Sequence, residues 1–222
     1  NASTRLLDDM HYRGLLRVAG RQSGTRIYAV RAPLPAPADA DAIAFRMDAL
    51  LDLLVRTYAP LPEASLRQLM SYLERGVPQW RDARAAALDR ARLRLDGARI
   101  DGVDWLWPAG ETPRSRRWRA DAAVRLLTPF DPVVWDRRRF ELFWGWRYRF
   151  EAYTPAPKRR LGYYALPLLW GERVIGWGNL AVVGGALSVD LGYVAGRPPR
   201  DPAFAEGLAQ ELERMRLFLD SK

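Results

Sequence analysis

The pattern that most constrains the fold is a helix followed directly by a two-stranded hairpin, because it occurs twice along the chain. In the first copy, a helical segment in residues 6–16 runs into Gly14, and apolar-rich strand segments follow over 15–19 and 25–30. The sequence Gln-Ser-Gly between these segments favours a tight turn. A winged-helix domain ends in this way, so we predict the end of one over residues 1–32.

The second copy follows a stiff, proline-rich segment that begins at Pro33 and marks a domain boundary. Beyond it, apolar residues recur at helical spacing, and strand-like residues come after them. The expected helices span 42–58, 64–75 and 79–95, and the expected strands lie around Ile100 and over 105–107. Three helices and a hairpin predict a complete winged helix over residues 33–110. Tandem winged helices usually bind duplex nucleic acid.

The charge balance points to the same kind of partner. Lysine and arginine number 35 and aspartate and glutamate 26, a net charge of +9 over 222 residues. A GC-rich genome explains why arginine replaces lysine, but it does not explain the excess of positive charge. Residues 111–160 hold thirteen bases and six acids, and therefore most of that excess. A polyanion such as DNA is the expected partner.

The composition excludes several kinds of chemistry. The chain has no cysteine, which rules out disulfides, thiolate nucleophiles and cysteine zinc sites. His11 is the single histidine, so a multi-histidine metal site is excluded, and we expect it to be a packing or capping residue. We expect no metal and no cofactor. No apolar stretch is long enough to cross a bilayer and no secretory signal is visible, so we expect a cytoplasmic protein without a membrane partner.

The last third of the chain predicts a different domain, over residues 111–222. Aromatic residues alternate with charged ones over 144–152, which predicts a strand with one guanidinium face. Three further strands are expected over 162–169, 173–181 and 186–194, separated by glycine-containing turns. They suggest a small antiparallel β-barrel-like domain, followed by a helix with Asp201 as N-cap and Pro202 at its first position. The expected fold class is therefore α+β.

The candidate nucleic-acid-binding residues are bases in three parts of the chain. Two short basic runs are expected to contact phosphates, two further arginines lie on the charged face of the predicted strand, and two on the third helix are candidates for entering a groove. These residues are Arg137, Arg138, Arg139, Arg147, Arg149, Lys158, Arg159, Arg160, Arg81 and Arg84.

Each candidate also has a plainer interpretation. Charge runs are commonly solvated faces, Arg147 or Arg149 can instead pair with Glu151, and Arg81, Arg84 and Arg90 can simply solvate an amphipathic helix. Asp131 and Asp136 fit ion-paired braces better than acid–base catalysts. The aromatic residues at 144–150 fit a core better than a base-stacking platform. We predict no catalytic residue in this chain.

A resemblance to a known family rests on two long runs. LTPFDPVVWDRRR at 127–139 and YRFEAYTPAPKRRLGYYALPLL at 148–169 resemble the bacterial crosslink-repair DNA glycosylases, winged-helix DNA-binding proteins of the YcaQ type. Residues 11–18 and 26–28 also look like the end of that family's second winged helix. The resemblance implies a bacterial protein with three winged helices and a β-barrel-like domain, which excises alkylated bases and unhooks interstrand crosslinks.

Two departures from the family pattern bear on activity. In such enzymes a glutamine followed two residues later by aspartate or glutamine positions the attacking water, whereas none of Gln22, Gln68, Gln79 and Gln210 has that neighbour. On the resemblance, the catalytic motif belongs to a region preceding residue 1. The family's basic-acidic-basic pattern after Gly176 is also replaced, by Trp177, Asn179 and Ala181.

We therefore expect the C-terminal portion of a DNA-repair glycosylase-like protein that binds damaged duplex DNA. Two alternatives remain open: a non-enzymatic winged-helix protein such as a transcription regulator, and an interaction domain whose basic surface binds an acidic protein. The sequence specifies neither the lesion nor the oligomeric state, nor whether the departures at 177, 179 and 181 abolish activity.

Overall fold

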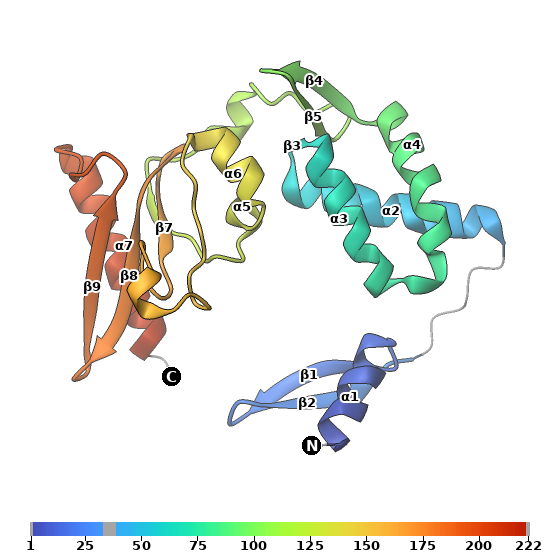
Figure 1. The fold of residues 1–222 in the computed structure, drawn as a ribbon, viewed down its shortest axis with the longest axis horizontal. Coiled ribbons are helices and arrows are strands. Elements are labelled where there is room, and N and C mark those ends of the chain that lie inside the picture. The colour runs from blue at the N-terminus through green and yellow to red at the C-terminus, as the bar shows by residue number, and fades with distance from the viewer. Residues whose placement is uncertain (1, 33–38, 221–222) are drawn as a thin grey trace. The chain divides into compact units, whose positions relative to one another are not determined.

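The computed structural model of the protein describes residues 2–32 and 39–220, with the side chains of Trp118 and Asp220 excepted. The chain forms two compact units, each described here by itself. The N-terminal unit comprises residues 1–53 and 67–94, and the C-terminal unit comprises residues 54–66 and 95–222. The proline-rich segment expected as a linker falls largely at 33–38, outside the described residues. Figure 1 shows the order of the elements.

The N-terminal unit begins with the predicted helix and hairpin. Helix α1 (Ala2–Tyr12) is followed by strands β1 (Leu16–Gln22) and β2 (Thr25–Val30), which pair antiparallel. His11 lies near the end of α1, and its Nδ1 is 3.1 Å from the carbonyl oxygen of Leu16. The Tyr28 hydroxyl donates to Asp8 on α1 at 2.9 Å. These bonds tie the helix to the hairpin, and they agree with a packing role for His11.

Three longer helical segments follow. Helix α2 (Ala40–Tyr58) and helix α3 (Glu63–Gly76) confirm two predicted helices. The third predicted helix is divided into a 3₁₀ segment η1 (Pro78–Ala83) and helix α4 (Arg84–Arg94). Trp80, inside η1, has the non-helical angles φ −115° and ψ 15°, so the expected single helix over 79–95 was wrong in its first turn. The buried residues of α4 are Ala87 and Ala91, which share one face.

A three-stranded antiparallel sheet in the C-terminal unit has the order β3–β5–β4. Strand β3 (Leu61–Pro62) precedes α3, while β4 (Asp96–Ile100) and β5 (Val103–Trp107) form the second predicted hairpin. Both turn residues, Asp101 and Gly102, have positive φ, as a tight two-residue hairpin turn requires. Gly97 lies so close to β5 that a Cβ there would approach the Trp105 carbonyl oxygen at 2.6 Å.

The second sheet has four antiparallel strands in the order β6–β7–β8–β9. They are β6 (Val124–Leu126), β7 (Leu166–Trp170), β8 (Arg173–Val183) and β9 (Ala186–Tyr193). The expected barrel-like closure was wrong. Strands β6 and β9 lie at the two edges of the sheet and, among the described residues, do not pair with each other or with a further strand. The sheet is open, and its two faces are covered by other elements.

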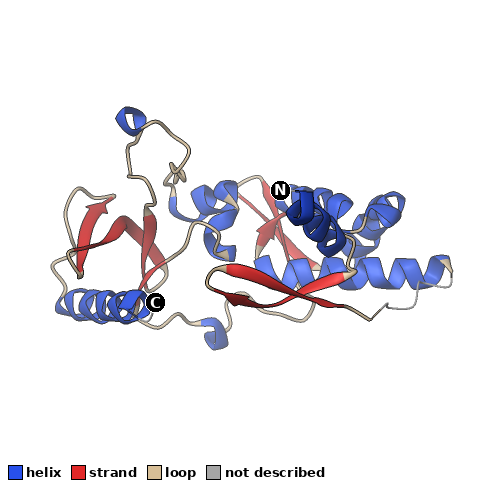
Figure 2. Cartoon of the chain, turned by 90° about the horizontal axis from the view of Figure 1, so that it is seen from below, coloured by secondary structure: helices blue, strands red, loops and turns tan. Residues whose placement is uncertain are grey.

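Helix α7 (Pro202–Asp220) covers one face of this sheet, as Figure 2 shows. The Asp201 carboxylate accepts from the backbone N–H of Ala203 at 2.8 Å, which confirms the predicted N-cap. Phe204 is buried, and Leu208, Leu212 and Met215 pack with it against the sheet residues Val124, Leu126, Leu166 and Leu168. No helix of the described residues combines the length and the apolar character that crossing a membrane needs.

The opposite face is covered by two short helices and an irregular segment. The helices are α5 (Pro132–Trp135) and α6 (Arg137–Trp144), and the irregular segment, residues 146–150, follows them in the sequence. From these elements Val134, Phe140 and Tyr148 are buried in one cluster with Ala165 and Val174. The strand expected over 144–152 was wrong. Residue 144 ends α6, Gly145 turns the chain with φ 64°, and residues 146–150 are irregular and pair into no sheet.

Candidate nucleic-acid interface

A concave cationic surface of the C-terminal unit, here called the basic groove, has a volume of about 980 Å³. It brings together most of the bases predicted to contact phosphates, with two carboxylates, Glu141 and Glu151, among them. The six bases in its lining are Arg137, Arg138, Arg147, Arg149, Lys158 and Arg160. Residues that lie up to 23 positions apart in the sequence thus share one hollow.

The turn of α6 decides which residues of the first basic run face the groove. Asp136 caps the helix by accepting from the Arg139 backbone N–H at 3.1 Å. Successive residues then point about 100° apart, so that Arg137 is half-buried, Arg138 is exposed and Arg139 is buried. The guanidinium of Arg137 donates to the carbonyl oxygens of Val134 and Pro129 and lies 4.5 Å from the centre of the Tyr148 ring. These contacts hold it in one orientation.

Arg139 points away from the groove and is only 3% exposed. Its guanidinium donates to the carbonyl oxygens of Tyr58 and Pro132. Burial lowers the pKa of Arg139, and the nearby carboxylate of Asp136 opposes that effect. A side chain in this position cannot reach a phosphate without breaking those bonds, and Arg139 does not line the groove.

The irregular segment 146–150 presents its charges as the sequence alternation predicted, although it is not a strand. Trp146 and Phe150 are half-buried and Tyr148 is 1% exposed, while Arg147 and Arg149 are exposed. These aromatic residues belong to the core, as the plainer interpretation held. Burial raises the pKa of Tyr148 to about 12, so its hydroxyl stays protonated and donates to the Ala165 carbonyl oxygen at 2.7 Å.

The bases of the groove differ in how far they are paired. Arg147 lies 3.3 Å from the carboxylate of Glu141 on α6. Arg138, Arg149 and Lys158 are exposed, and among the described residues no partner is found for their side chains. Positive charges that are close together without carboxylate partners repel each other and attract an anion.

Glu151 positions the second basic run instead of neutralising it. It is 6% exposed, and its Oε2 accepts from the backbone N–H groups of Arg160 at 2.8 Å and Leu161 at 2.7 Å, with Gly162 further away at 3.4 Å. Burial acts to raise the pKa of Glu151, but these N–H donors and the charge of Arg160 outweigh it, and the pKa is lowered. Its charge is thus satisfied by the backbone, which folds the segment after η3 (Ala156–Lys158) toward the groove.

Besides Arg139, three of the predicted residues lie outside the groove lining. Arg159 donates to the Thr154 carbonyl oxygen at 2.7 Å and covers the Tyr163 ring at 4.8 Å. Arg81 and Arg84 belong to the N-terminal unit. Arg84 pairs with Glu74 at 3.1 Å, whereas Arg81 is exposed and lies 3.6 Å from Asp82.

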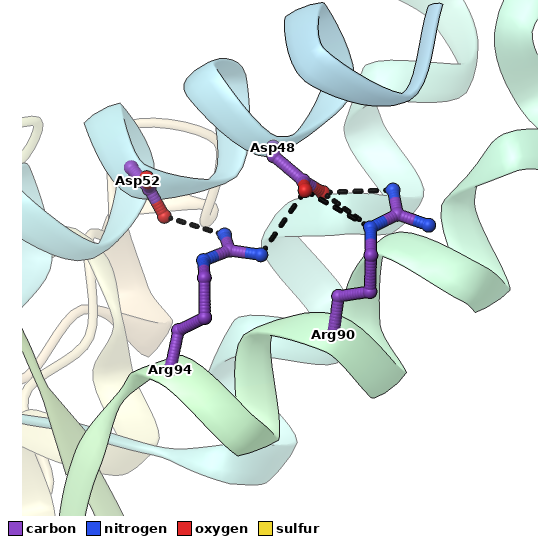
Figure 3. A network of polar contacts seen from close by, with 4 residues as sticks. All are labelled: Asp48, Asp52, Arg90 and Arg94. Atoms are coloured by element: carbon purple, nitrogen blue, oxygen red, sulfur yellow. Dashed lines mark hydrogen bonds and ion pairs between the residues drawn. The ribbon is translucent and has the colours of Figure 1, made fainter. Parts of the chain in front are cut away.

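Arginines of α4 form a polar network that the sequence did not predict (Figure 3). Arg90 binds both carboxylate oxygens of Asp48, at 2.9 Å through Nε and 2.8 Å through Nη2. Arg94 donates to Asp48 at 3.1 Å and to Asp52 at 2.9 Å. The hydrogen bond to Asp48 raises the pKa of Arg90. The two aspartates are four residues apart on α2, and the two arginines are four residues apart on α4. This spacing places each pair on one face of its helix, and it was the feature of the sequence that could have predicted the network.

Two of the three residues that depart from the family pattern, Trp177 and Asn179, contact the segments that line the groove. Trp177 stacks on Trp146 with ring centres 5.8 Å apart, and its indole leaves no room for a Cβ at Gly192. The amide of Asn179 donates to the Leu161 carbonyl oxygen at 2.8 Å. Asp131 and Asp136, considered earlier as braces, cap α5 and α6 through backbone N–H groups.

A concave cationic face on a scaffold of mixed helices and antiparallel sheets is typical of proteins that bind polyanions. The family model described as "DNA glycosylase AlkZ-like" matches residues 1–218. The chain therefore belongs to the AlkZ-like DNA glycosylase family, which confirms the resemblance read from its sequence. Comparison with solved structures found no match.

Proposed function

We propose that the basic groove binds the phosphate backbone of duplex DNA and that this chain is the DNA-gripping, C-terminal portion of a repair glycosylase. The observation that carries the proposal is that the side chains of Arg138, Arg149 and Lys158, on one concave face, have no partner among the described residues. Membership of a DNA glycosylase family supports DNA as the polyanion. Arg137, Arg147 and Arg160 complete the proposed contact surface.

Counterion release explains why such a surface prefers DNA to small anions. Duplex DNA carries condensed cations, and each phosphate that a protein neutralises releases part of that atmosphere. Six bases in one hollow allow several such contacts at once. Phosphate contacts fix the position of the protein on the duplex and carry no base sequence, which suits a repair protein that must act wherever a lesion lies.

The order of elements supports a winged helix in residues 33–110, which we include in the proposal. Helix α2, strand β3, helices α3 and α4 and the hairpin β4–β5 follow one another in the order of that motif. The sheet order β3–β5–β4 also fits it. Residues 1–32, with a helix and a hairpin, would be the end of a preceding winged helix, and residues 111–222 a separate basic domain.

The chemistry proposed for the whole protein is excision of alkylated bases and unhooking of crosslinks, with no cofactor. Hydrolysis of the glycosidic bond would be performed by a glutamine-containing motif outside this chain. This chain would hold the damaged duplex so that the reaction takes place at the lesion. Arg81 and Arg84 of the N-terminal unit are proposed as secondary contacts.

Fluorescence anisotropy with a labelled duplex across a salt series tests the groove. We expect log affinity to fall linearly with log salt, and the double variant Arg138→Ala, Arg149→Ala to bind about tenfold more weakly with a slope smaller by about 2. Arg197→Ala, an exposed arginine outside the groove lining, is the matched control and should leave both quantities unchanged. A double variant with the affinity and slope of the control would overturn the proposal.

The same assay separates the alternatives. A repair protein should bind a duplex with an alkylated or distorted site more tightly than the intact duplex, whatever the surrounding sequence. A transcription regulator should instead prefer one intact sequence. Failure to bind any duplex at low salt, together with binding to an acidic protein, would favour an interaction domain.

A further inference from the structure

A second hollow in the C-terminal unit, away from the basic groove, is walled by aromatic rings. Its volume is about 580 Å³, within the roughly 300–1,000 Å³ typical of ligand sites. Trp105 and Trp107 of β5 and Phe143 of α6 line it, together with aliphatic residues of the β4–β5 hairpin. Few polar residues line it, and Asp101 and Arg114 are among them. We call it the aromatic pocket.

The rings of this pocket are held in place: Trp105 is buried, whereas Trp107 and Phe143 are partly open to solvent. Trp105 is 8% exposed and stacks on Phe143 with ring centres 5.1 Å apart and planes 16° apart, while Phe143 itself remains 41% exposed. The indole N–H of Trp107 donates to the Glu111 carbonyl oxygen at 3.1 Å, which fixes that ring. Ordered aromatic faces of this kind accept a further planar ring by stacking.

A small basic hollow adjoins the aromatic pocket and shares Pro113 and Arg114 with it. Arg116 and Arg119 also line this hollow, which includes one carboxylate, Glu172. The three arginines are exposed, and in the described part of the chain their side chains have no partner. A guanidinium cluster of this kind suits a phosphate, which accepts paired hydrogen bonds from arginine.

We infer that the aromatic pocket and the adjoining arginines form a binding site for one unpaired nucleotide, with the base against the aromatic rings and the phosphate against Arg114, Arg116 and Arg119. A base in an intact duplex is stacked and paired, so it cannot enter. The carboxylate of Asp101 would accept from an exocyclic amino group of the base. The inference does not depend on the basic groove, because no residue lines both surfaces.

The test uses the full chain and a fluorescent base, 2-aminopurine, whose emission falls on stacking. We expect saturable quenching with 2-aminopurine nucleoside 5′-monophosphate and binding of the phosphate-free nucleoside that is roughly fivefold weaker or more. A single-stranded oligonucleotide with one 2-aminopurine identifies the natural source. Strand binding that is tighter than that of the mononucleotide and is weakened by Arg114→Ala would assign the site to an unpaired base in DNA, and strand binding no tighter than that of the mononucleotide would assign it to a free nucleotide.

Variants at the two hollows make the test specific. Arg114→Ala should weaken mononucleotide binding about fivefold or more, and Phe143→Leu should reduce the quenching. Arg114 is exposed, so its loss should leave the thermal midpoint unchanged, even if Phe143→Leu lowers it. Arg138→Ala, in the basic groove, should weaken duplex binding and leave mononucleotide binding intact. Absence of saturable quenching, or equal binding by wild type and Arg114→Ala, would overturn the nucleotide site without affecting the groove.

Discussion

Arginines of helix α4 and arginines of the basic groove have the same chemistry but opposite surroundings. Arg90 and Arg94 are each bound by carboxylates of α2, so their charge is cancelled within the fold. In the groove, Arg138 and Arg149 have no such partner among the described residues. The comparison shows that the net charge of +9 is not spread evenly over the surface. Positive charge is available to a ligand where basic side chains have no carboxylate partner among the described residues.

The acidic residues explain this difference. Asp48 and Asp52 lie on successive turns of α2. They accept hydrogen bonds from Arg90 and Arg94, which lie on successive turns of α4. Glu151 lines the groove together with the bases, yet it is buried and engages the backbone N–H groups of residues 160–162. One region therefore uses its carboxylates to join two helices, and the other uses its carboxylate to shape a loop.

The largest effect is expected from Glu151→Gln. The neutral amide would still accept from the loop N–H groups but without charge, and we expect the free energy of unfolding to fall by about 2 kcal/mol. Chemical denaturation measures it. Glu141→Gln is the control. Its position is half-buried, its carboxylate pairs with an exposed arginine, and among the described residues no other partner is found for it, so the change should cost less than about 0.5 kcal/mol. Equal losses for both variants would contradict the positioning role of Glu151.

Glu151 also predicts a pH dependence. Because its pKa is lowered in the folded protein, its contribution to stability is complete above the ordinary glutamate value of about 4.3 and is lost as pH falls through the folded pKa. The difference in unfolding free energy between wild type and Glu151→Gln should therefore be constant from neutral pH to about pH 5 and narrow below about pH 4. A difference that stays constant at acid pH would show that the carboxylate does not titrate as described.

Asp48→Asn tests the network between α2 and α4. It removes the charge that holds Arg90 and Arg94, and because the two arginines are more than a third exposed, the expected loss is modest, about 1–2 kcal/mol. Duplex affinity should stay within about twofold of wild type, since the groove is not altered. Asp104→Asn, in the exposed pair with Arg99, is the control, with an expected loss under about 0.5 kcal/mol. A large loss of affinity in Asp48→Asn would mean that the network itself contacts DNA.

The smallest expected effect comes from releasing a paired arginine in the groove. Glu141→Gln frees Arg147, and we expect duplex affinity to rise about two- to threefold and the salt slope to steepen by up to about 0.9. Anisotropy in the same salt series measures both. An unchanged slope would mean that Arg147 does not reach a phosphate even when it is unpaired.

Local rules predicted much of the fold. Asp201 followed by Pro202 identified the start of α7, and the glycines at 171, 184 and 185 identified the hairpin turns with positive φ. Each of these features acts within a few residues, so no distant contact was needed to recognise it.

The failures have a common cause, because they depend on what a segment meets in three dimensions. The alternation over 146–150 correctly separated buried rings from exposed arginines, but it cannot reveal that no neighbouring strand pairs with the segment. In the same way, three consecutive arginines look identical in the sequence, while the rotation of α6 exposes Arg138 and buries Arg139. Asp48 and Arg90 meet only because α2 and α4 pack together.

The hydrogen bond from Arg139 to the Tyr58 carbonyl has a consequence for anyone who dissects the gene. A fragment that starts at Glu111, where the composition changes, would lack that acceptor, and the buried guanidinium of Arg139 would lose one of its two hydrogen-bond partners among the described residues. The last turn of α2 is thus an architectural part of the C-terminal unit. Fragments that begin at or before Leu54 keep the Tyr58 carbonyl, and we expect them to be more stable to unfolding than a fragment that begins at Glu111.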